Sequence, residues 1–213
     1  MLKANRKTLI VTSIVTLLPI LAGVLLWDRL PEVMATHFGI DNQADGYSSK
    51  AFGVFGLPLM LVAIEWIGAM VMASDPKKQN INPKLFTLGL WIVPAISLLG
   101  AAILYTYNLG REPDITFIMQ LLLGVLLVVV GNYLPKARQS YTIGIRLPWT
   151  LAHEENWNRT HRLGGYLWVA GGILMIITAL TGLLSAKMLF AVTLVLVLLP
   201  CLYSYWLHIK RAM

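Results

Sequence analysis

The sequence has little charge and a single cysteine. Asp, Glu, Lys and Arg make up only 13% of its 213 residues, against about 25% in an average soluble domain. Because 57% of the residues are hydrophobic, the polar residues are too few to cover the surface of a water-soluble fold. Cys201, the one cysteine, excludes a disulfide framework and a zinc site built from clustered cysteines.

Signatures of an enzyme are also missing. His153 and Glu154 are followed by a second histidine at His161, too far along the chain for the zinc-binding His-Glu-x-x-His helix. The chain contains no Gly-x-Ser-x-Gly motif and no Walker loop. The net charge is +7, but nucleic-acid binding requires Lys and Arg clustered on a polar face, and so apolar a sequence has too few polar residues to form one. We predict a protein that is not an enzyme, holds no cofactor or metal and does not bind nucleic acid directly.

Long apolar runs dominate what is present. A bilayer core of about 30 Å takes about 20 mostly apolar residues of helix. Six runs have this length, namely 8–27, 51–73, 85–107, 115–134, 164–184 and 189–208. They predict an all-α, polytopic membrane protein that lies in the lipid bilayer, with residues 1–213 as a single integral membrane domain.

The cations indicate how the spans are oriented. Lys and Arg in short loops resist translocation across the membrane. With the N-terminus inside, thirteen of the 17 Lys and Arg residues lie in segments on the inner side. We therefore expect both termini in the cytoplasm, the loop 28–50 outside and the loop 135–163 inside. Both loops exceed the about 12 to 15 residues of ordinary connections, so we expect the function to reside in them.

Four of the spans contain a proline, and the fifth span contains rows of small residues. Proline removes a backbone hydrogen bond from a helix, so Pro19, Pro58, Pro94 and Pro200 indicate either packing kinks or functional hinges. Small residues let two helix backbones approach closely. Two rows of them at a spacing of seven predict that the fifth span packs against another helix: Gly164, Gly171, Thr178 and Ser185, and beside them Gly165, Gly172, Ala179 and Ala186.

Glu65 is the one acid inside a span, near the middle of its helix. An ionised carboxylate at that depth costs about 2.5 to 3.5 kcal/mol, so the side chain is expected to face the interior of the protein. Two interpretations are open. Glu65 is either a neutral, hydrogen-bonded packing residue or a proton-linked switch or transport site.

The loop 28–50 contains side chains of metal-binding type. His37, Asp41 and Asp45 are spaced by four residues, which would align them on a helix, whereas Gly39 and Gly46 favour turns. The run from Asp41 departs from a calcium loop because glutamine fills its third position. Three alternatives are open: a structural cap made of turns, a surface that faces a toxin or ligand, and a metal site.

The loop 135–163 suits a membrane surface. Trp149 is of the residue type that favours the headgroup layer, and Thr150 is expected to cap a short helix that continues toward Gly164. On this helix Glu155 and Arg159 are spaced to form an ion pair.

His153, Trp157 and His161 share one face of the same predicted helix. The helix either lies in the membrane interface, with Trp157 as its anchor, or forms a docking face for a protein partner or a closing gate of the bundle.

Both loops carry family motifs. In the outer loop the matching residues are Leu30, Pro31, His37, Phe38, Asp45, Gly46 and Lys50, as in a short module at the start of many small bacterial membrane proteins. In the inner segment, whose motif is the more specific, they include Asn132, Pro135, Lys136, Gly144, Arg146, Pro148, Trp149, Trp157 and His161. Together with six spans in the same order, these motifs resemble the SdpI family of toxin-immunity proteins. Ser140 and Leu147 depart from it, since asparagine and threonine are expected there.

The resemblance implies a multi-pass protein of a bacterial plasma membrane that confers resistance to a secreted peptide toxin. The outer motif would face the toxin. The resemblance further implies a receptor that holds a small cytosolic helix-turn-helix repressor at the membrane through the inner loop. The alternative is a small proton-linked or peptide transporter, which Glu65, the prolines and a weak inverted repeat favour.

Overall fold

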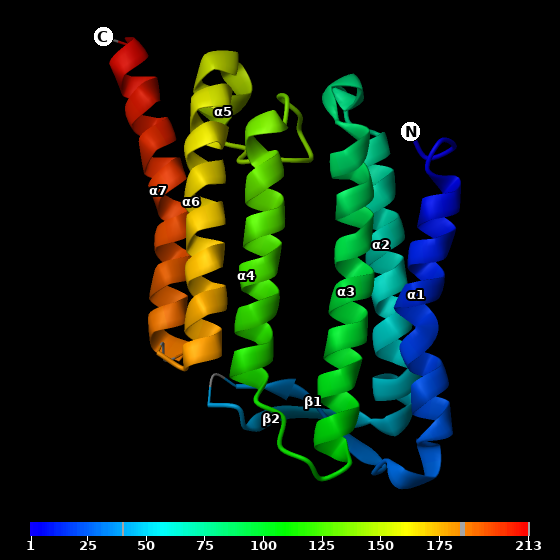
Figure 1. The fold of residues 1–213 in the computed structure, drawn as a ribbon. Coiled ribbons are helices and arrows are strands. Elements are labelled where there is room, and N and C mark those ends of the chain that lie inside the picture. The colour runs from blue at the N-terminus through cyan, green and yellow to red at the C-terminus, as the bar shows by residue number, and fades with distance from the viewer. Residues whose placement is uncertain (40, 184–185, 213) are drawn as a thin grey trace. The chain divides into compact units, whose positions relative to one another are not determined.

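The computed structural model describes residues 1–39, 41–183 and 186–212 and is dominated by six long helices (Figure 1). They are α1 (Arg6–Leu25), α2 (Leu57–Ala73), α3 (Pro83–Asn108), α4 (Ile115–Tyr133), α6 (Glu154–Thr181) and α7 (Ala186–Ala212). Each, with α2 extended at its start by the π-helical turn Phe52–Gly56, is long and apolar enough to cross a membrane. The prediction of an all-α, six-span membrane protein is confirmed. The predicted end of the fifth span at Leu184, and Ser185 of the small-residue row, lie outside the described residues.

The chain forms two compact units. Unit 1 comprises Met1–Ser74 and Phe86–Ile115, and unit 2 comprises Asp75–Leu85 and Thr116–Met213. Unit 1 therefore holds α1, α2 and most of α3. Unit 2 holds α4, α6, α7 and the short helix α5 (Pro148–Ala152).

The fifth span begins ten residues earlier than the sequence predicts, at Glu154 instead of residue 164. Two acids in its first turn favour a helix start there, because they complement the positive end of the helix dipole. Asn156, Thr160 and His161, which follow, are buried inside unit 2, so this stretch is the start of the helix instead of a loop. At about 1.5 Å per residue, the 28 residues of α6 are longer than the apolar core of a bilayer.

The loop between α1 and α2 folds as an antiparallel hairpin of β1 (Val33–Phe38) and β2 (Ala44–Ser49), which the sequence does not predict. Side chains alternate between exposed and half-buried along β2, as they do in a strand with one covered face. Asn42 turns the chain with a φ of +64°, a conformation that asparagine adopts more readily than most residues. Figure 1 shows the hairpin at the end of α1 from which the chain returns to α2.

A small apolar core fixes the hairpin to the helices of unit 1. Met34 is fully buried and lies with Leu30, Val54, Leu104 and Tyr105. Asn108 at the end of α3 accepts a hydrogen bond from Ala35 N–H at 2.9 Å and donates one to the Ala35 carbonyl at 3.0 Å. The asparagine amide thus pairs with the edge of β1 as a neighbouring strand would.

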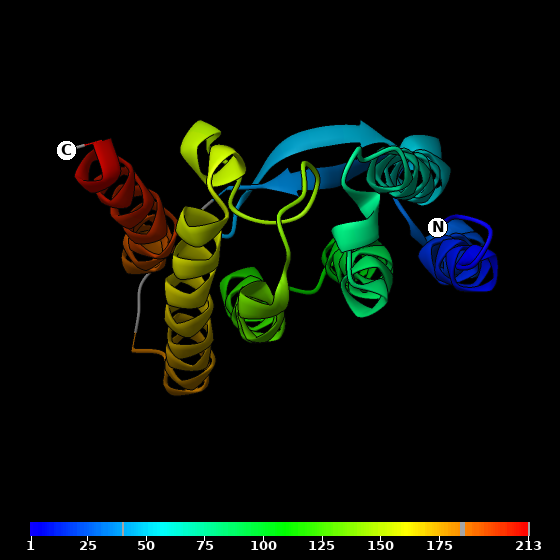
Figure 2. The ribbon, with the colours of Figure 1, turned by 90° about the horizontal axis from the view of Figure 1, so that it is seen from above.

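In unit 2, α6 lies between α4 and α7 (Figures 1 and 2). A Cβ placed on Gly172 would lie 2.8 Å from Val128 N of α4, and one on Gly131 of α4 would lie 2.9 Å from Val169 N of α6. A Cβ on Gly171 would instead meet Leu196 of α7 at 2.7 Å. The predicted close approach of the fifth span to another helix is confirmed. The two neighbouring rows of small residues serve two different partners, because adjacent positions on a helix point about 100° apart.

Pro200 illustrates how a proline is accommodated in a span. It cannot donate to the carbonyl of Leu196, four residues earlier. The indole N–H of Trp168 on α6 donates to that carbonyl at 3.0 Å, so the freed acceptor is satisfied by a neighbouring helix.

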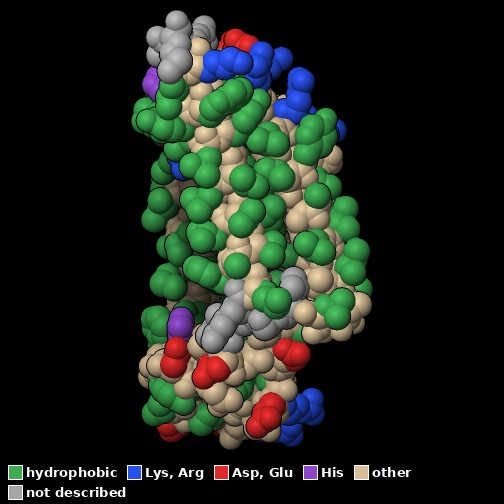
Figure 3. All heavy atoms as spheres, turned by 90° about the vertical axis from the view of Figure 1, so that its left-hand side faces the viewer, with side chains coloured by type: hydrophobic (Ala, Val, Ile, Leu, Met, Phe, Trp, Pro, Cys, Tyr) green, Lys and Arg blue, Asp and Glu red, His purple; other side chains and the backbone are tan. Residues whose placement is uncertain are grey.

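The surface of this part of the protein matches a bilayer. Figure 3 shows hydrophobic side chains over most of the visible face and most of the Lys and Arg in view toward one end of it. Large apolar side chains of α7 such as Phe190, Leu202 and Trp206 are more than half exposed. In water such a face would be a liability, whereas in lipid it is the expected outer surface of the fold.

Candidate functional site

The signature segment, residues 134–163, folds around a buried pair of aromatic rings in unit 2. Trp157 and His161 are fully buried, and their rings stack with centroids 3.9 Å apart. The indole N–H of Trp157 donates to the Ala137 carbonyl at 2.8 Å. The sequence places both residues on one helix face, and the structure confirms that spacing. The interpretation of Trp157 as an interfacial anchor is wrong, because its side chain is enclosed by protein.

The hydrogen bonds of His161 define its protonation. The backbone N–H of Ile145 donates to His161 Nε2 at 2.9 Å, so that nitrogen carries no proton. His161 Nδ1 then carries the proton and donates to the Trp157 carbonyl at 2.7 Å. The neutral ring therefore ties the loop before α5 to the first turns of α6.

Gly144 is required beneath this ring pair. Its φ is +121°, a backbone conformation in which a residue with a side chain is strained. A Cβ there would also lie 2.8 Å from Cη2 of Trp157. Of the family motif residues in this segment, Gly144, Trp157 and His161 are thus brought together in one contact.

Thr150 and Trp149 connect α5 to its surroundings. Thr150 was predicted as the cap of a helix toward Gly164; it lies instead within α5, where its hydroxyl accepts from Leu147 N–H at 2.8 Å and donates to the Ile145 carbonyl at 2.9 Å. The indole N–H of Trp149 donates to Ser204 Oγ of α7 at 2.8 Å, and Ser204 in turn donates to Asn156 Oδ1 at 2.6 Å.

Asp75 and Gln139 are residues that the sequence reasoning missed. Asp75 is buried, and its carboxylate accepts from Lys77 N–H at 2.7 Å, Tyr141 N–H at 2.9 Å and the Thr142 hydroxyl at 2.7 Å. Gln139 donates to two carbonyls of α5 and accepts from the Lys77 ammonium group. The one signal in the sequence is the position of Asp75 directly after a span and before a proline, which marks a turn but not its distant partners.

Other residues of the inner motif lie on the surface. Asn132, Pro135, Lys136, Arg146 and Pro148 are exposed. Arg146 donates to the Tyr141 carbonyl at 2.7 Å, which holds the loop closed across five residues. The remaining exposed members of the segment include three cations, Arg138, Arg159 and Arg162, and two acids, Glu154 and Glu155.

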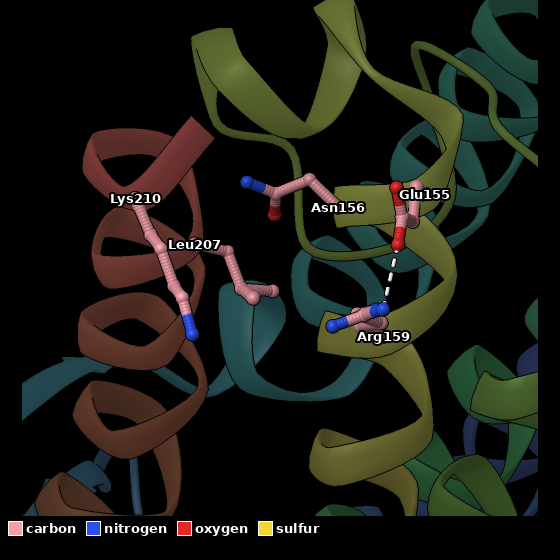
Figure 4. Close-up of a pocket in the computed structure, with 5 residues that line it drawn as sticks. All are labelled: Glu155, Asn156, Arg159, Leu207 and Lys210. Atoms are coloured by element: carbon pink, nitrogen blue, oxygen red, sulfur yellow. Dashed lines mark ion pairs between the residues drawn. The ribbon is translucent and has the colours of Figure 1, made fainter. Parts of the chain in front are cut away.

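A shallow pocket opens between the first turns of α6 and the last turns of α7 (Figure 4). It measures about 200 Å³ and is lined by Glu155, Asn156, Arg159, Leu207 and Lys210. The predicted pair of Glu155 and Arg159 is present, with a nitrogen-to-oxygen distance of 2.7 Å.

The hairpin presents only some of its motif residues. His37 and Asp45 are exposed and lie 2.5 Å apart, and Gly46 leaves no room for a Cβ beside His37. Pro31 is also exposed. Phe38 packs edge-on against Tyr107 of α3.

Two motif residues of the same loop hold it from beneath. Leu30 belongs to the apolar core. Lys50 is buried, pairs with Glu32 at 2.8 Å, donates to the Trp27 carbonyl at 3.2 Å and lies over the Trp27 ring. In the part of the chain that the structure describes, no three His, Cys, Asp or Glu side chains gather as they would around a metal, so Asp41 does not complete a site with His37 and Asp45.

Glu65 lies inside unit 1 and faces α1. Its side chain is buried and contacts the hydroxyls of Thr12, Ser13 and Thr16. The expectation that it faces the protein interior is confirmed. Ser97 of α3 donates to the Thr16 carbonyl at 2.8 Å, so the same stretch of α1 is contacted from two helices.

Six apolar spans, a folded hairpin and a folded polar segment define a multi-pass membrane protein. The model of the SdpI/YfhL protein family matches residues 136–204, and that of a domain of unknown function, DUF1648, matches residues 14–62. Immunity protein SdpI of Bacillus subtilis (strain 168) is 26% identical over 205 residues, which are 96% of this chain and 97% of that protein. No solved structure matches the chain. The chain is similar to the SdpI family and is a multi-pass protein of the bacterial cell membrane.

The two family matches divide along the structure. The SdpI/YfhL match covers most of the signature segment, α6 and the greater part of α7. The second match covers most of α1, the hairpin and the start of α2. Glu65 lies outside both ranges.

Proposed function

We propose that this protein makes its host cell resistant to a secreted antimicrobial peptide. The observation that supports it is the similarity to an immunity protein over nearly the whole of both chains. Expression in a toxin-sensitive strain, followed by challenge with the peptide, tests it. Survival with the intact protein and death with an empty vector are expected, whereas equal killing of both strains contradicts the proposal.

The hairpin is the proposed toxin-facing surface. It exposes both apolar and polar side chains, since Val33 is 64% and Tyr47 63% exposed and the pair of His37 and Asp45 is exposed on the same hairpin. A membrane-active peptide is amphipathic, so a surface of this mixed character matches both of its faces.

This function requires the hairpin outside the cell and both termini in the cytoplasm, as the distribution of Lys and Arg favours. Replacing Cys201 by serine and placing single cysteines at Tyr47 or at Arg146 tests the orientation. A membrane-impermeant maleimide applied to intact cells is expected to label Tyr47→Cys but not Arg146→Cys. The reverse pattern contradicts it.

The signature segment is the proposed docking site for a cytosolic partner, for which the family resemblance implies a small helix-turn-helix repressor. Its buried network keeps the segment rigid, while its exposed cations remain available to acidic groups of a partner. Lys136→Glu with Arg138→Glu is expected to abolish membrane recruitment of the repressor and to leave resistance intact. Lys3→Glu with Lys7→Glu is the matched control, and equal loss in both variants contradicts a specific docking site.

A further inference from the structure

The carboxyl group of Glu65 has no charged partner in the membrane. It lies in the span Phe52–Ala73, eight residues before its end at Ala73, which is about 12 Å at 1.5 Å per residue. No other acid or base occurs in 8–25 of α1, in the rest of α2 or in 86–104 of α3. The nearest titratable side chain along α3, Tyr105, is bonded through its hydroxyl to the Pro19 carbonyl at 3.0 Å.

The hydroxyls around Glu65 already have acceptors for their protons. Thr12 Oγ1 lies 2.9 Å from the Thr8 carbonyl, and Thr16 Oγ1 lies 2.9 Å from the Thr12 carbonyl. Ser13 Oγ lies 2.8 Å from the Leu9 carbonyl and accepts from the indole N–H of Trp66 at 3.0 Å.

A hydroxyl has one proton to donate. Ser13 and Thr16 are each 3.5 Å from Glu65, much farther than from their own helix carbonyls. Glu65 Oε1 also contacts Thr12 Oγ1. Because Thr12 Oγ1 lies 2.9 Å from the Thr8 carbonyl and 3.1 Å from the Leu9 carbonyl, its one proton has acceptors within α1, and a proton shared with Glu65 is then supplied by the carboxyl group.

From this geometry we propose that Glu65 is a proton-binding site, occupied at neutral pH, in which the carboxylic acid donates its proton to Thr12 Oγ1. A neutral acid removes the cost of an ionised carboxylate in lipid. Loss of the proton would leave an unpaired charge, and among the described residues the side chains bonded to it are the hydroxyls of α1. They would have to turn away from their helix carbonyls, so proton occupancy is coupled to the packing of α1 against α2. The proposal does not depend on toxin resistance.

Infrared spectroscopy of the full-length protein in lipid membranes at pH 7 tests it. A protonated carboxyl group gives a carbonyl band distinct from that of a carboxylate. The other four glutamates, Glu32, Glu112, Glu154 and Glu155, are exposed, and carboxylates in water are charged at this pH. With ¹³C-labelled glutamate we expect one isotope-shifted acid band, absent from Glu65→Gln. Wild-type protein without an acid band overturns the proposal.

Two further measurements separate the alternatives. Thr12→Val removes the proposed acceptor and should shift the acid band, whereas Ser13→Ala should leave it in place; this comparison holds even if Glu65→Gln does not fold. Replacing potassium by sodium at constant pH should have no effect. Loss of the acid band in sodium would overturn the assignment, because it would identify a sodium ion as the competing occupant of the same oxygens.

Discussion

The hairpin and the signature segment are both long polar loops in the sequence, yet they are held by different means. The hairpin is held mainly by backbone hydrogen bonds between its two strands. Its motif residues His37 and Asp45 are exposed to solvent. The signature segment has no strand pairing and depends on buried side chains such as Trp157 and His161. Substitutions of exposed motif residues in the hairpin should therefore affect function, whereas substitutions of the buried motif residues in the signature segment should affect folding.

Gly144→Ala should produce the largest loss. Backbone strain at a positive φ and overpacking against Trp157 together cost about 2 to 5 kcal/mol. The thermal denaturation midpoint in detergent measures it. Gly110→Ala is the control, since Gly110 also has a positive φ but nothing lies within 4 Å of its Cβ position. Equal losses in the two variants would show that the contact with Trp157 does not matter.

His161→Phe should produce the next largest loss of stability. It leaves the Ile145 N–H without its acceptor in a buried site, which costs about 1 to 3 kcal/mol. The matched change in the hairpin, His37→Phe, removes a side chain that is 75% exposed and should alter stability by less than about 0.5 kcal/mol. Similar denaturation midpoints for the two variants would contradict the difference between the buried histidine of the signature segment and the exposed histidine of the hairpin.

Asn108→Ala should loosen the hairpin by about 1 to 2 kcal/mol, because two hydrogen bonds to Ala35 are lost. Limited proteolysis at the hairpin turn measures this, and cleavage should become faster. Asn108→Asp retains the acceptor for Ala35 N–H but not the donor, so an intermediate rate is expected. An unchanged rate in both variants would mean that the apolar core alone fixes the hairpin.

His37→Ala should have the smallest effect on stability, within about 0.5 kcal/mol, but it should lower survival under toxin challenge. Gln43→Ala, at an exposed position of the same turn, is the control and should survive as the wild type does. Unchanged survival of His37→Ala would count against the hairpin as the toxin-facing surface.

The sequence identifies the motif residues of the signature segment and the spacing between them, but it does not show which of them are buried. The spacing of Trp157 and His161 places them on one face, and they do stack. The same spacing does not show whether that face meets lipid, water or protein. Asp75 was missed because two of its partners, Tyr141 and Thr142, lie 66 and 67 residues away in the sequence.

The six spans were determined by the sequence alone, because a helix across lipid needs a long apolar run and lipid offers its backbone no other partner. Which polar residues become structural was decided only by the tertiary structure. Lys50, Asp75 and His161 look like surface residues in the sequence. They are buried because the fold brings acceptors and donors to them from distant segments, and a polar group is stable inside a protein only when such partners are present.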